Sequence, residues 1–411
     1  MTSSNATAAA RRQFDQAMAV LDVDRDAAHR HFREATDADP SMADAWLGRV
    51  AVGDDGLATL QELYAYGSRL HRESNRLGVG LAAIAKAGPY LSITVTEAAH
   101  AGLALASALI DGKQFEKAEA VLTDSALLDS WENHQWQQYV RAYLMFATQR
   151  WPDVIAEAAR ILPPQAIIMS AVTAATNALA AHAAAHLGQG RVALDWAERV
   201  ELSSDRSSLT EGRRHSFPDA AVTVIDPAQF PLIAADLAYI RGMAHRQLGE
   251  EQSAQIWLSR STINGALIEP AKQALADPRI QLVITDEAAI TSRTDKWDVS
   301  TEQSEQERSE EENAERRAEL LAEGRALLAN QVGLAEVKQA VAELEDQIEV
   351  RALRLAHGLP VANQTNHMLL VGPPGTGKTT TAEALGKIYA GFGIVRHPEV
   401  IEVRRSDLCG E

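Results

Sequence analysis

The 411-residue chain has little cysteine and few aromatic residues. Its one cysteine, Cys409, excludes an internal disulfide and fits the reducing environment of the cytoplasm. Aromatic residues make up only 5% of the chain, although 46% of it is hydrophobic. The core must therefore be built mainly from alanine and aliphatic residues. Because alanine is the strongest helix former, we expect a mainly α-helical protein.

Long apolar runs are also missing. The most apolar stretch, residues 171–187, is interrupted by Thr173, Thr176 and Asn177, so we expect no membrane span. The N-terminal residues lack the apolar core of a secretory signal. Together with the scarcity of cysteine, these absences predict a cytoplasmic protein.

Positive charge is the third deficit. The chain carries 39 lysines and arginines against 56 aspartates and glutamates, which gives a formal net charge of −17. No basic stripe with interleaved aromatic residues is present, and nucleic-acid binding depends on cationic contacts. We therefore expect no nucleic-acid partner, and the partners that we expect are proteins.

Residues 1–285 carry a weak helical repeat. Ala28, Phe32 and Ala35 have the spacing of the second helix of a tetratricopeptide-type repeat, and Pro40 follows them. Later segments repeat part of this pattern: Phe115 with Ala118, Trp151 with Ala156, Leu187-Gly188 with Ala193, and Leu248-Gly249 with Ala254. The pattern predicts a tetratricopeptide-like helical-repeat domain over 1–285, with a generic helical bundle as the alternative. Stacked helix pairs present a concave face that receives a peptide or a helix.

Tryptophan and histidine offer few candidates for chemistry in this region. The seven tryptophans fall mostly at helix-packing positions, so we assign them to the core. His182 and His186 are one helical turn apart, a spacing that suits a metal site, but neither a cysteine nor a carboxylate accompanies them. We therefore interpret them as two half-exposed histidines on an alanine-rich helix.

The composition changes after residue 285. Residues 300–315 contain seven glutamates and almost no apolar residue, which is typical of a solvated linker or a fraying acidic helix. We place an acidic linker over 286–318. Helical periodicity returns over 316–330 and 334–355, and residues 319–411 are the predicted second domain.

Residues 372–380 read GPPGTGKTT and contain the P-loop pattern G-x-x-x-x-G-K-S/T in full. The apolar run 367–371 before them predicts a buried parallel strand, and residues 379–390 after them predict a helix. A strand, a glycine loop and a helix in this order indicate a nucleotide site in an α/β P-loop domain. Its candidate residues are Gly372, Pro373, Pro374, Gly375, Thr376, Gly377, Lys378, Thr379 and Thr380.

The residue types in this loop suit the binding of ATP with Mg²⁺. Glycines let the chain turn tightly, so that successive N–H groups point at the β- and γ-phosphates. The helix that follows presents its positive end to the same phosphates. Lys378 adds a full charge and is the candidate catalytic residue, while the Thr379 hydroxyl is the candidate metal ligand.

Hydrolysis also requires an acidic Mg²⁺ partner on a second strand and, in most cases, an arginine from a neighbour. Residues 282–287 imitate such a strand, but they precede the loop, in the wrong order for an unpermuted fold. We interpret them as an ordinary segment at the end of the helical region. Only 31 residues follow Thr380. We therefore expect a truncated α/β domain that binds nucleotide weakly and does not hydrolyse it.

Several motifs together resemble a known family. Val332-Gly333-Leu334 followed by the glycine loop resembles the opening of an AAA+ ATPase module, and the run 367–393 resembles its CbxX/CfxQ branch. With the N-terminal helices and the segments 43–49 and 292–298, the chain is similar to the EccA family, cytosolic ATPases of ESX (type VII) secretion systems.

The resemblance implies that Val332 and Gly333 line an adenine pocket. It also implies that the helical domain binds secreted ESX substrates or their chaperones, and that the AAA+ domain forms a homo-hexamer that remodels or releases them with ATP. The family's Walker B strand and arginine finger would lie beyond Glu411. Two alternatives remain open at this point: a helical adaptor with a nucleotide-controlled switch, and a remodelling ATPase similar to Rubisco activases.

Overall fold

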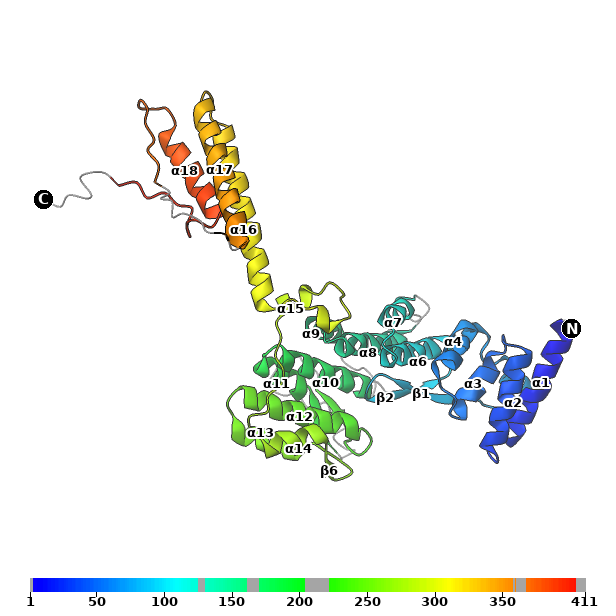
Figure 1. Cartoon of the computed structure of the whole chain (residues 1–411). Helices are drawn as coiled ribbons and strands as arrows, with labels where there is room; N and C mark the ends of the chain where they lie inside the picture. The colour runs from blue at the N-terminus through cyan, green and yellow to red at the C-terminus, as the bar shows by residue number, and fades with distance from the viewer. Residues whose placement is uncertain are drawn as a thin grey trace. The chain divides into compact units, whose positions relative to one another are not determined.

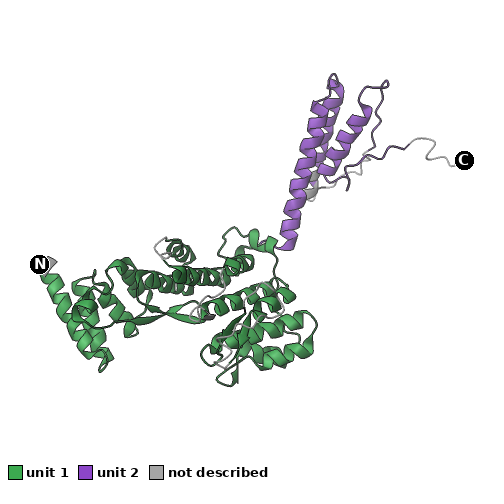
Figure 2. Cartoon of the chain, turned by 180° about the vertical axis from the view of Figure 1, so that it is seen from behind, with its two compact units in different colours: residues 1–302 green, residues 303–411 purple. Residues whose placement is uncertain are grey.

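The computed structural model describes residues 3–124, 130–160, 170–203, 222–357, 359 and 367–403. Unit 1 comprises residues 1–302 and unit 2 comprises residues 303–411; Figure 2 colours them separately. Cys409 lies outside the described residues. Within the described residues, no helix combines the length and the apolar character that crossing a bilayer requires.

Unit 1 is built from paired helices (Figure 1). Its α-helices are α1 (Ser3–Val20), α2 (Arg25–Ala38), α3 (Ala43–Ala51), α4 (Leu57–Ala65), α5 (Arg72–Leu77), α6 (Ala98–Asp111), α7 (Phe115–Leu122), α8 (Trp131–Ala147), α9 (Trp151–Arg160), α10 (Ser170–His186), α11 (Gly190–Glu198), α12 (Pro231–Gln247), α13 (Glu251–Ser259), α14 (Glu269–Ala276) and α15 (Glu287–Thr291). Helix α1 packs on α2, α6 on α7, α8 on α9, α10 on α11 and α12 on α13. Successive pairs also contact each other through α6, α8, α10 and α12.

Helix α2 shows how the repeat pattern becomes packing. Asp24 caps its first turn by accepting a hydrogen bond from the Ala27 N–H at 2.9 Å. The predicted inward residues Ala28, Phe32 and Ala35 are fully buried. A Cβ atom added to Gly48 on α3 would lie 2.3 Å from the Phe32 ring, so this crossing requires glycine.

Two later repeats end in glycine as predicted. Gly188 and Gly249 have φ values of +72° and +76°, the left-handed conformation that ends a helix. The alanines that follow, Ala193 and Ala254, are buried. The prediction for Ala156 was wrong, because this residue is exposed. Ala158 is buried in its place, since it lies seven residues after Trp151 and so faces the same side of α9.

Unit 1 also contains three described two-stranded sheets that were not predicted from the sequence. Strands β1 (Ala83–Ala87) and β2 (Leu91–Val95) form an antiparallel hairpin with Ala87 opposite Leu91. The burial pattern of β2 was visible in its alternating apolar and polar residues, whereas that of β1 was not, because Ile84 is apolar and 70% exposed. Strands β3 (Val200–Leu202) and β4 (Thr223–Ile225) are parallel, and β5 (Thr262–Ile263) pairs antiparallel with β6 (Ala266–Leu267).

The predicted linker 286–318 is divided between the two units. Residues 286–302 belong to unit 1, where Trp297 is buried and packs on Phe115 with ring centroids 5.9 Å apart. From residue 305 the acidic run is helical and forms the start of α16 (Glu305–Ala329). A capping box between Ser304 and Glu307 begins that helix, which is the local signal that favours a helix over a loop.

Unit 2 holds three described helices: α16, α17 (Ala335–Ala356) and α18 (Lys378–Gly391). Their shared apolar cluster contains Leu328, Val341, Ala384, Leu385 and Ile388. Helices α16 and α18 approach closely at two glycines. A Cβ atom on Gly324 would lie 2.8 Å from Ile388, and one on Gly391 would lie 2.5 Å from Leu321. The boundaries of α17 and α18 confirm the predicted helices to within one residue.

Candidate functional site

The predicted strand before the glycine loop is not formed. Residues 367–373 have no regular secondary structure, and Leu369 and Val371 are 84% and 83% exposed. A strand requires a neighbour that pairs with its backbone groups, and none of the described residues of unit 2 offers one. The prediction of a buried parallel strand over 367–371 is therefore corrected to an irregular segment that is exposed except at Leu370, which packs on the apolar cluster of unit 2.

The glycine loop has the backbone conformation that its sequence predicts. Gly375 and Gly377 have φ values of +81° and +77°, which residues with side chains rarely adopt. Gly377 is the N-cap residue of α18, so the helix begins at Lys378, one residue earlier than predicted. The Thr376 hydroxyl donates a hydrogen bond to the Pro373 carbonyl at 2.9 Å and closes the turn. The first turn of α18, whose backbone N–H groups have no partner within the helix, therefore comes directly after the loop in the chain.

Lys378 folds back over the loop. Its Nζ donates hydrogen bonds to the carbonyl oxygens of Gly372 at 2.9 Å and Pro373 at 2.6 Å. An ammonium held at the mouth of a turn of amide groups is suited to an anion, because both carry positive charge or partial charge. The carbonyl contacts keep Lys378 beside the loop.

The three threonines after Lys378 differ in their surroundings. The Thr381 hydroxyl donates to the Gly377 carbonyl at 2.9 Å and is buried in the helix packing. Thr379 is exposed and Thr380 is half-buried. Of these hydroxyl groups, that of Thr379 is the one available to a ligand at the loop. The described residues contain no group of three histidine, cysteine or carboxylate side chains that could hold a metal by itself. A cation here would depend on Thr379 together with oxygens of a bound phosphate.

The segment before α17 lies against the loop. A Cβ atom on Gly377 would lie 2.2 Å from the Gln331 side-chain oxygen, so Gln331 occupies the space beside the loop. Gln331 was not among the predicted site residues, although it immediately precedes Val332-Gly333. Gly333 has a left-handed φ of +82°, and the Val332 side chain is 97% exposed. The described residues thus bring this segment to the loop but form no apolar slot around Val332.

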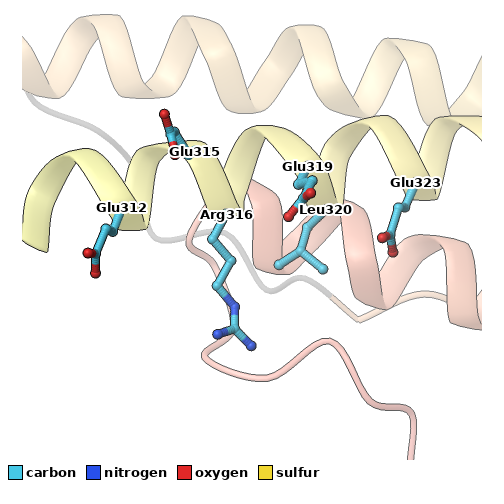
Figure 3. A pocket seen from close by; sticks show the side chains of 6 residues that line it. All are labelled: Glu312, Glu315, Arg316, Glu319, Leu320 and Glu323. Carbon is cyan, nitrogen blue, oxygen red and sulfur yellow. The ribbon is translucent and has the colours of Figure 1, made fainter.

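A shallow hollow in unit 2 lies along α16, away from the glycine loop in the sequence (Figure 3). It is lined by Glu312, Glu315, Arg316, Glu319, Leu320 and Glu323. These side chains recur at helical spacing on one helix, and Glu323 pairs with Lys387 of α18. Solvated carboxylates on a single helix need no ligand, so we assign this hollow no chemistry.

The prediction of two half-exposed histidines on α10 was right for His186, which is half-buried, and wrong for His182. His182 is buried, and Asp236 of α12 brings a carboxylate within 2.8 Å of its Nε2 atom. His186 stacks on Trp151 with ring centroids 4.5 Å apart. The tryptophan assignment holds, since Trp151, Trp196 and Trp297 are buried and the other four are half-buried.

A mainly helical unit followed by a glycine loop at the start of a helix is the arrangement of a helical domain that precedes part of an AAA domain. Residues 6–213 and 219–303 match the family described as "T7SS, ESX-1 secretion system protein EccA1, N-terminal domain". Residues 368–411 match "ATPase family associated with various cellular activities (AAA)". The chain belongs to the EccA family of ESX secretion-system ATPases.

Individual relatives agree with this family. The chain is 61% identical to the ESX-2 secretion system protein EccA2 of Mycobacterium tuberculosis, over 98% of this chain and 64% of the relative. It is 32% identical to the ESX-5 secretion system protein EccA5 of Mycobacterium marinum, over 93% of this chain and 59% of the relative. The chain therefore spans about 60% of the length of these relatives.

A solved structure supports the fold of the helical part. The crystal structure of the N-terminal domain of the EccA1 ATPase from the ESX-1 secretion system of Mycobacterium tuberculosis matches with a TM-score of 0.57 at 21% identity. The match covers 73% of this chain and all of that structure. The mainly helical fold, with an N-terminal helical domain and part of an AAA domain, is thereby confirmed.

Proposed function

We propose that the chain supplies the cargo-binding and nucleotide-binding parts of a cytoplasmic AAA+ ATPase of type VII (ESX) secretion. Residues 1–285 bind secreted substrates or their chaperones, and residues 319–411 bind ATP with Mg²⁺. The observation that carries the proposal is the pair of left-handed glycines, Gly375 and Gly377, directly before the N-terminus of α18 in a member of the EccA family.

Each loop residue has a distinct part in this function. Lys378 exchanges its contacts with the Gly372 and Pro373 carbonyls for oxygens of the β- and γ-phosphates, while backbone N–H groups of 375–380 hold the same phosphates. Thr379 binds Mg²⁺. Val332 and Gly333 lie near the adenine, and the position of the preceding residue Gln331 beside Gly377 supports this assignment. The full-length protein assembles as a homo-hexamer and uses ATP hydrolysis to remodel or release its cargo.

The nucleotide part is tested by the ATPase rate of the full-length protein. Replacement of Lys378 by alanine removes the charge at the phosphates and is expected to lower the rate at least about ten-fold. Lys387→Ala is the matched control, because Lys387 lies on the same helix but pairs with Glu323. An unchanged rate in Lys378→Ala contradicts the proposal.

The cargo part is tested by capture of purified secreted ESX proteins on the immobilised 411-residue chain. Specific capture is expected, and in the full-length protein ATP is expected to release the captured cargo. Capture that is indifferent to ATP favours the adaptor with a nucleotide switch. Absence of capture by a protein that still hydrolyses ATP favours a remodelling enzyme similar to Rubisco activases.

A further inference from the structure

Four arginines surround a polar cup in unit 1. The cup lies between α1, the turn that joins α2 to α3, and the segment from the short 3-10 helix Gly67–Arg69 to α5. Its cationic lining consists of Arg11, Arg69, Arg72 and Arg76. Such a gathering of guanidinium groups is unexpected on a chain with a net charge of −17. It calls for an anionic partner, either within the protein or outside it.

The three carboxylates of the cup supply only part of that partner. Asp44 is buried and accepts hydrogen bonds from three backbone N–H groups, those of His71 at 2.5 Å, Glu73 at 2.9 Å and Ser74 at 2.7 Å. Asp44 therefore caps the start of α5, and its charge is satisfied by the backbone rather than by an arginine.

Asp39 is likewise satisfied by its neighbours. It accepts hydrogen bonds from the Ser41 N–H at 3.1 Å, the Ser41 hydroxyl at 2.7 Å and the Thr7 hydroxyl at 3.2 Å. Burial raises the pKa of Asp39, but these hydrogen bonds, together with the charge of Arg69, outweigh burial and lower it.

Glu73 pairs with two of the four arginines. Arg11 Nε lies 2.9 Å from one carboxylate oxygen of Glu73, and Arg76 Nε lies 2.6 Å from the other. Arg76 also pairs with Asp15. These two arginines are therefore neutralised within the protein.

Arg69 and Arg72 differ from these two arginines, because neither is paired with a carboxylate of the described residues. Within the described residues, neither guanidinium has an ion pair or a hydrogen bond, and both side chains are exposed at the rim of the cup. Arg69 leans over the Tyr66 ring at 5.8 Å, which leaves its N–H groups open. Arg69 and Arg72 thus have no described carboxylate partner within hydrogen-bond distance, while the charge of Arg69 acts on Asp39 from farther away.

We propose that this cup binds an acidic peptide segment, with Arg69 and Arg72 pairing with its carboxylates. Guanidinium groups form strong, two-pronged hydrogen bonds with carboxylates. The apolar atoms of Ala6 and Pro40 in the same lining suit the peptide chain between the acidic side chains. This inference rests on the proposed function, since it gives the cargo an anchoring point on the helical domain.

The test is binding of a fluorescent glutamate-rich peptide to the 411-residue chain, followed by anisotropy at low and high salt. Binding is expected to weaken with salt, and the same peptide with glutamine in place of glutamate is expected not to bind. Arg69→Gln combined with Arg72→Gln should weaken binding at least about ten-fold. Because neither arginine holds an ion pair, this variant should fold normally, which circular dichroism verifies.

The matched control is Arg25→Gln combined with Arg30→Gln, which removes the same charge from exposed positions of α2 that do not line the cup. Equal weakening in both double variants, or equal binding of the glutamine peptide, overturns the inference. Displacement of the peptide by an equal concentration of inorganic phosphate also overturns it, since the cup would then be a general anion site. If secreted ESX proteins are captured equally well by Arg69→Gln/Arg72→Gln, the inference fails while the proposed function stands.

Discussion

His182 Nε2 lies 2.8 Å from the Oδ2 atom of Asp236, and the Tyr90 hydroxyl donates to the same oxygen. The three side chains come from the β1–β2 turn, α10 and α12. Burial, followed by the charge and the hydrogen bond of Asp236, raises the pKa of Tyr90 well above its ordinary value. Burial also raises the pKa of Asp236, but the attraction of nearby His182 and the hydrogen bond from Tyr90 outweigh it, and the net pKa is lowered. A single carboxylate therefore joins the hairpin to two helix pairs.

Asp236→Ala should lower the free energy of unfolding of unit 1 by about 1–3 kcal/mol, because it leaves the Tyr90 hydroxyl and His182 without their partner. Urea denaturation followed by circular dichroism measures the change. Asp37→Ala, at an exposed position of α2, should stay within about 0.5 kcal/mol of the unsubstituted chain. Equal stability of the two variants would show that the cluster contributes nothing.

The stability of unit 1 should fall in mildly acidic solution because of His186. Burial lowers the pKa of His186, the hydrogen bond to the Val283 carbonyl raises it, and nearby His182 lowers it again, with a net decrease. Below about pH 6.5 the unfolded chain therefore takes up a proton that the folded chain binds less readily, and stability is lost as the pH falls through the folded pKa.

Replacement of His186 by phenylalanine keeps an aromatic ring on Trp151 and removes the titrating group. Unfolding free energies measured from about pH 7 to about pH 5 should then show a shallower slope than in the unsubstituted chain. An identical slope in the two proteins would assign the pH dependence to other groups.

Two glycines of the loop offer a matched comparison. Gly375→Ala and Gly377→Ala both force alanine into a left-handed backbone, at a cost of about 1–2 kcal/mol each. Only the second also displaces a neighbour, since nothing lies within 4 Å of a Cβ atom on Gly375, whereas one on Gly377 would meet the end of the Gln331 side chain at 2.2 Å and force it to move. Gly377→Ala should therefore weaken binding of a fluorescent ATP analogue to the full-length protein more than Gly375→Ala. Gln331→Ala should partly restore binding in Gly377→Ala, and a lack of restoration would separate Gln331 from the loop.

Arg293 should be a major stabilising residue of unit 1. Its side chain is 1% exposed and donates to the carbonyl oxygens of Thr148 at 2.6 Å and Gln149 at 3.2 Å, while pairing with Glu302 at 2.6 Å. Arg293→Met removes these bonds where α8 ends, and the expected loss in the free energy of unfolding is about 2–4 kcal/mol. Arg279→Met, at a side chain that is 90% exposed, is the control and should change little. A small effect at Arg293 would mean that the segment 286–302 docks without it.

The sequence predicted best what depends on neighbouring residues. The loop 372–377 and helix α18 follow from glycines, a lysine and helical periodicity within about twenty residues, so no distant partner was needed. The strand 367–371 failed for the opposite reason, because a strand is stable only when another segment pairs with its backbone. An apolar run by itself does not show whether a second segment is available to pair with it.

Contacts between distant residues could not be predicted at all. Asp236 reaches His182 only because α10 and α12 pack together, and a search along the chain for a carboxylate beside the histidines fails. The arginine cup has the same origin, since Arg11 and Glu73 are 62 residues apart in the sequence. The hairpin was different, because Gly88-Pro89 and the alternating residues 91–95 after it were a local signal that helical composition obscured.

The two glycine crossings of α16 on α18 have a mechanical consequence. At Gly324 and Gly391 the two helices approach closely, because a Cβ atom at either glycine would meet both a side chain and a backbone carbonyl of the other helix. We therefore expect helix α16 to move as a rigid body together with α18, the helix that begins at the glycine loop. If both helices tilted by about 5° around Gly324, Glu305 at the N-terminal end of α16 would move by roughly 2–3 Å. A small adjustment at the loop would be magnified where α16 begins.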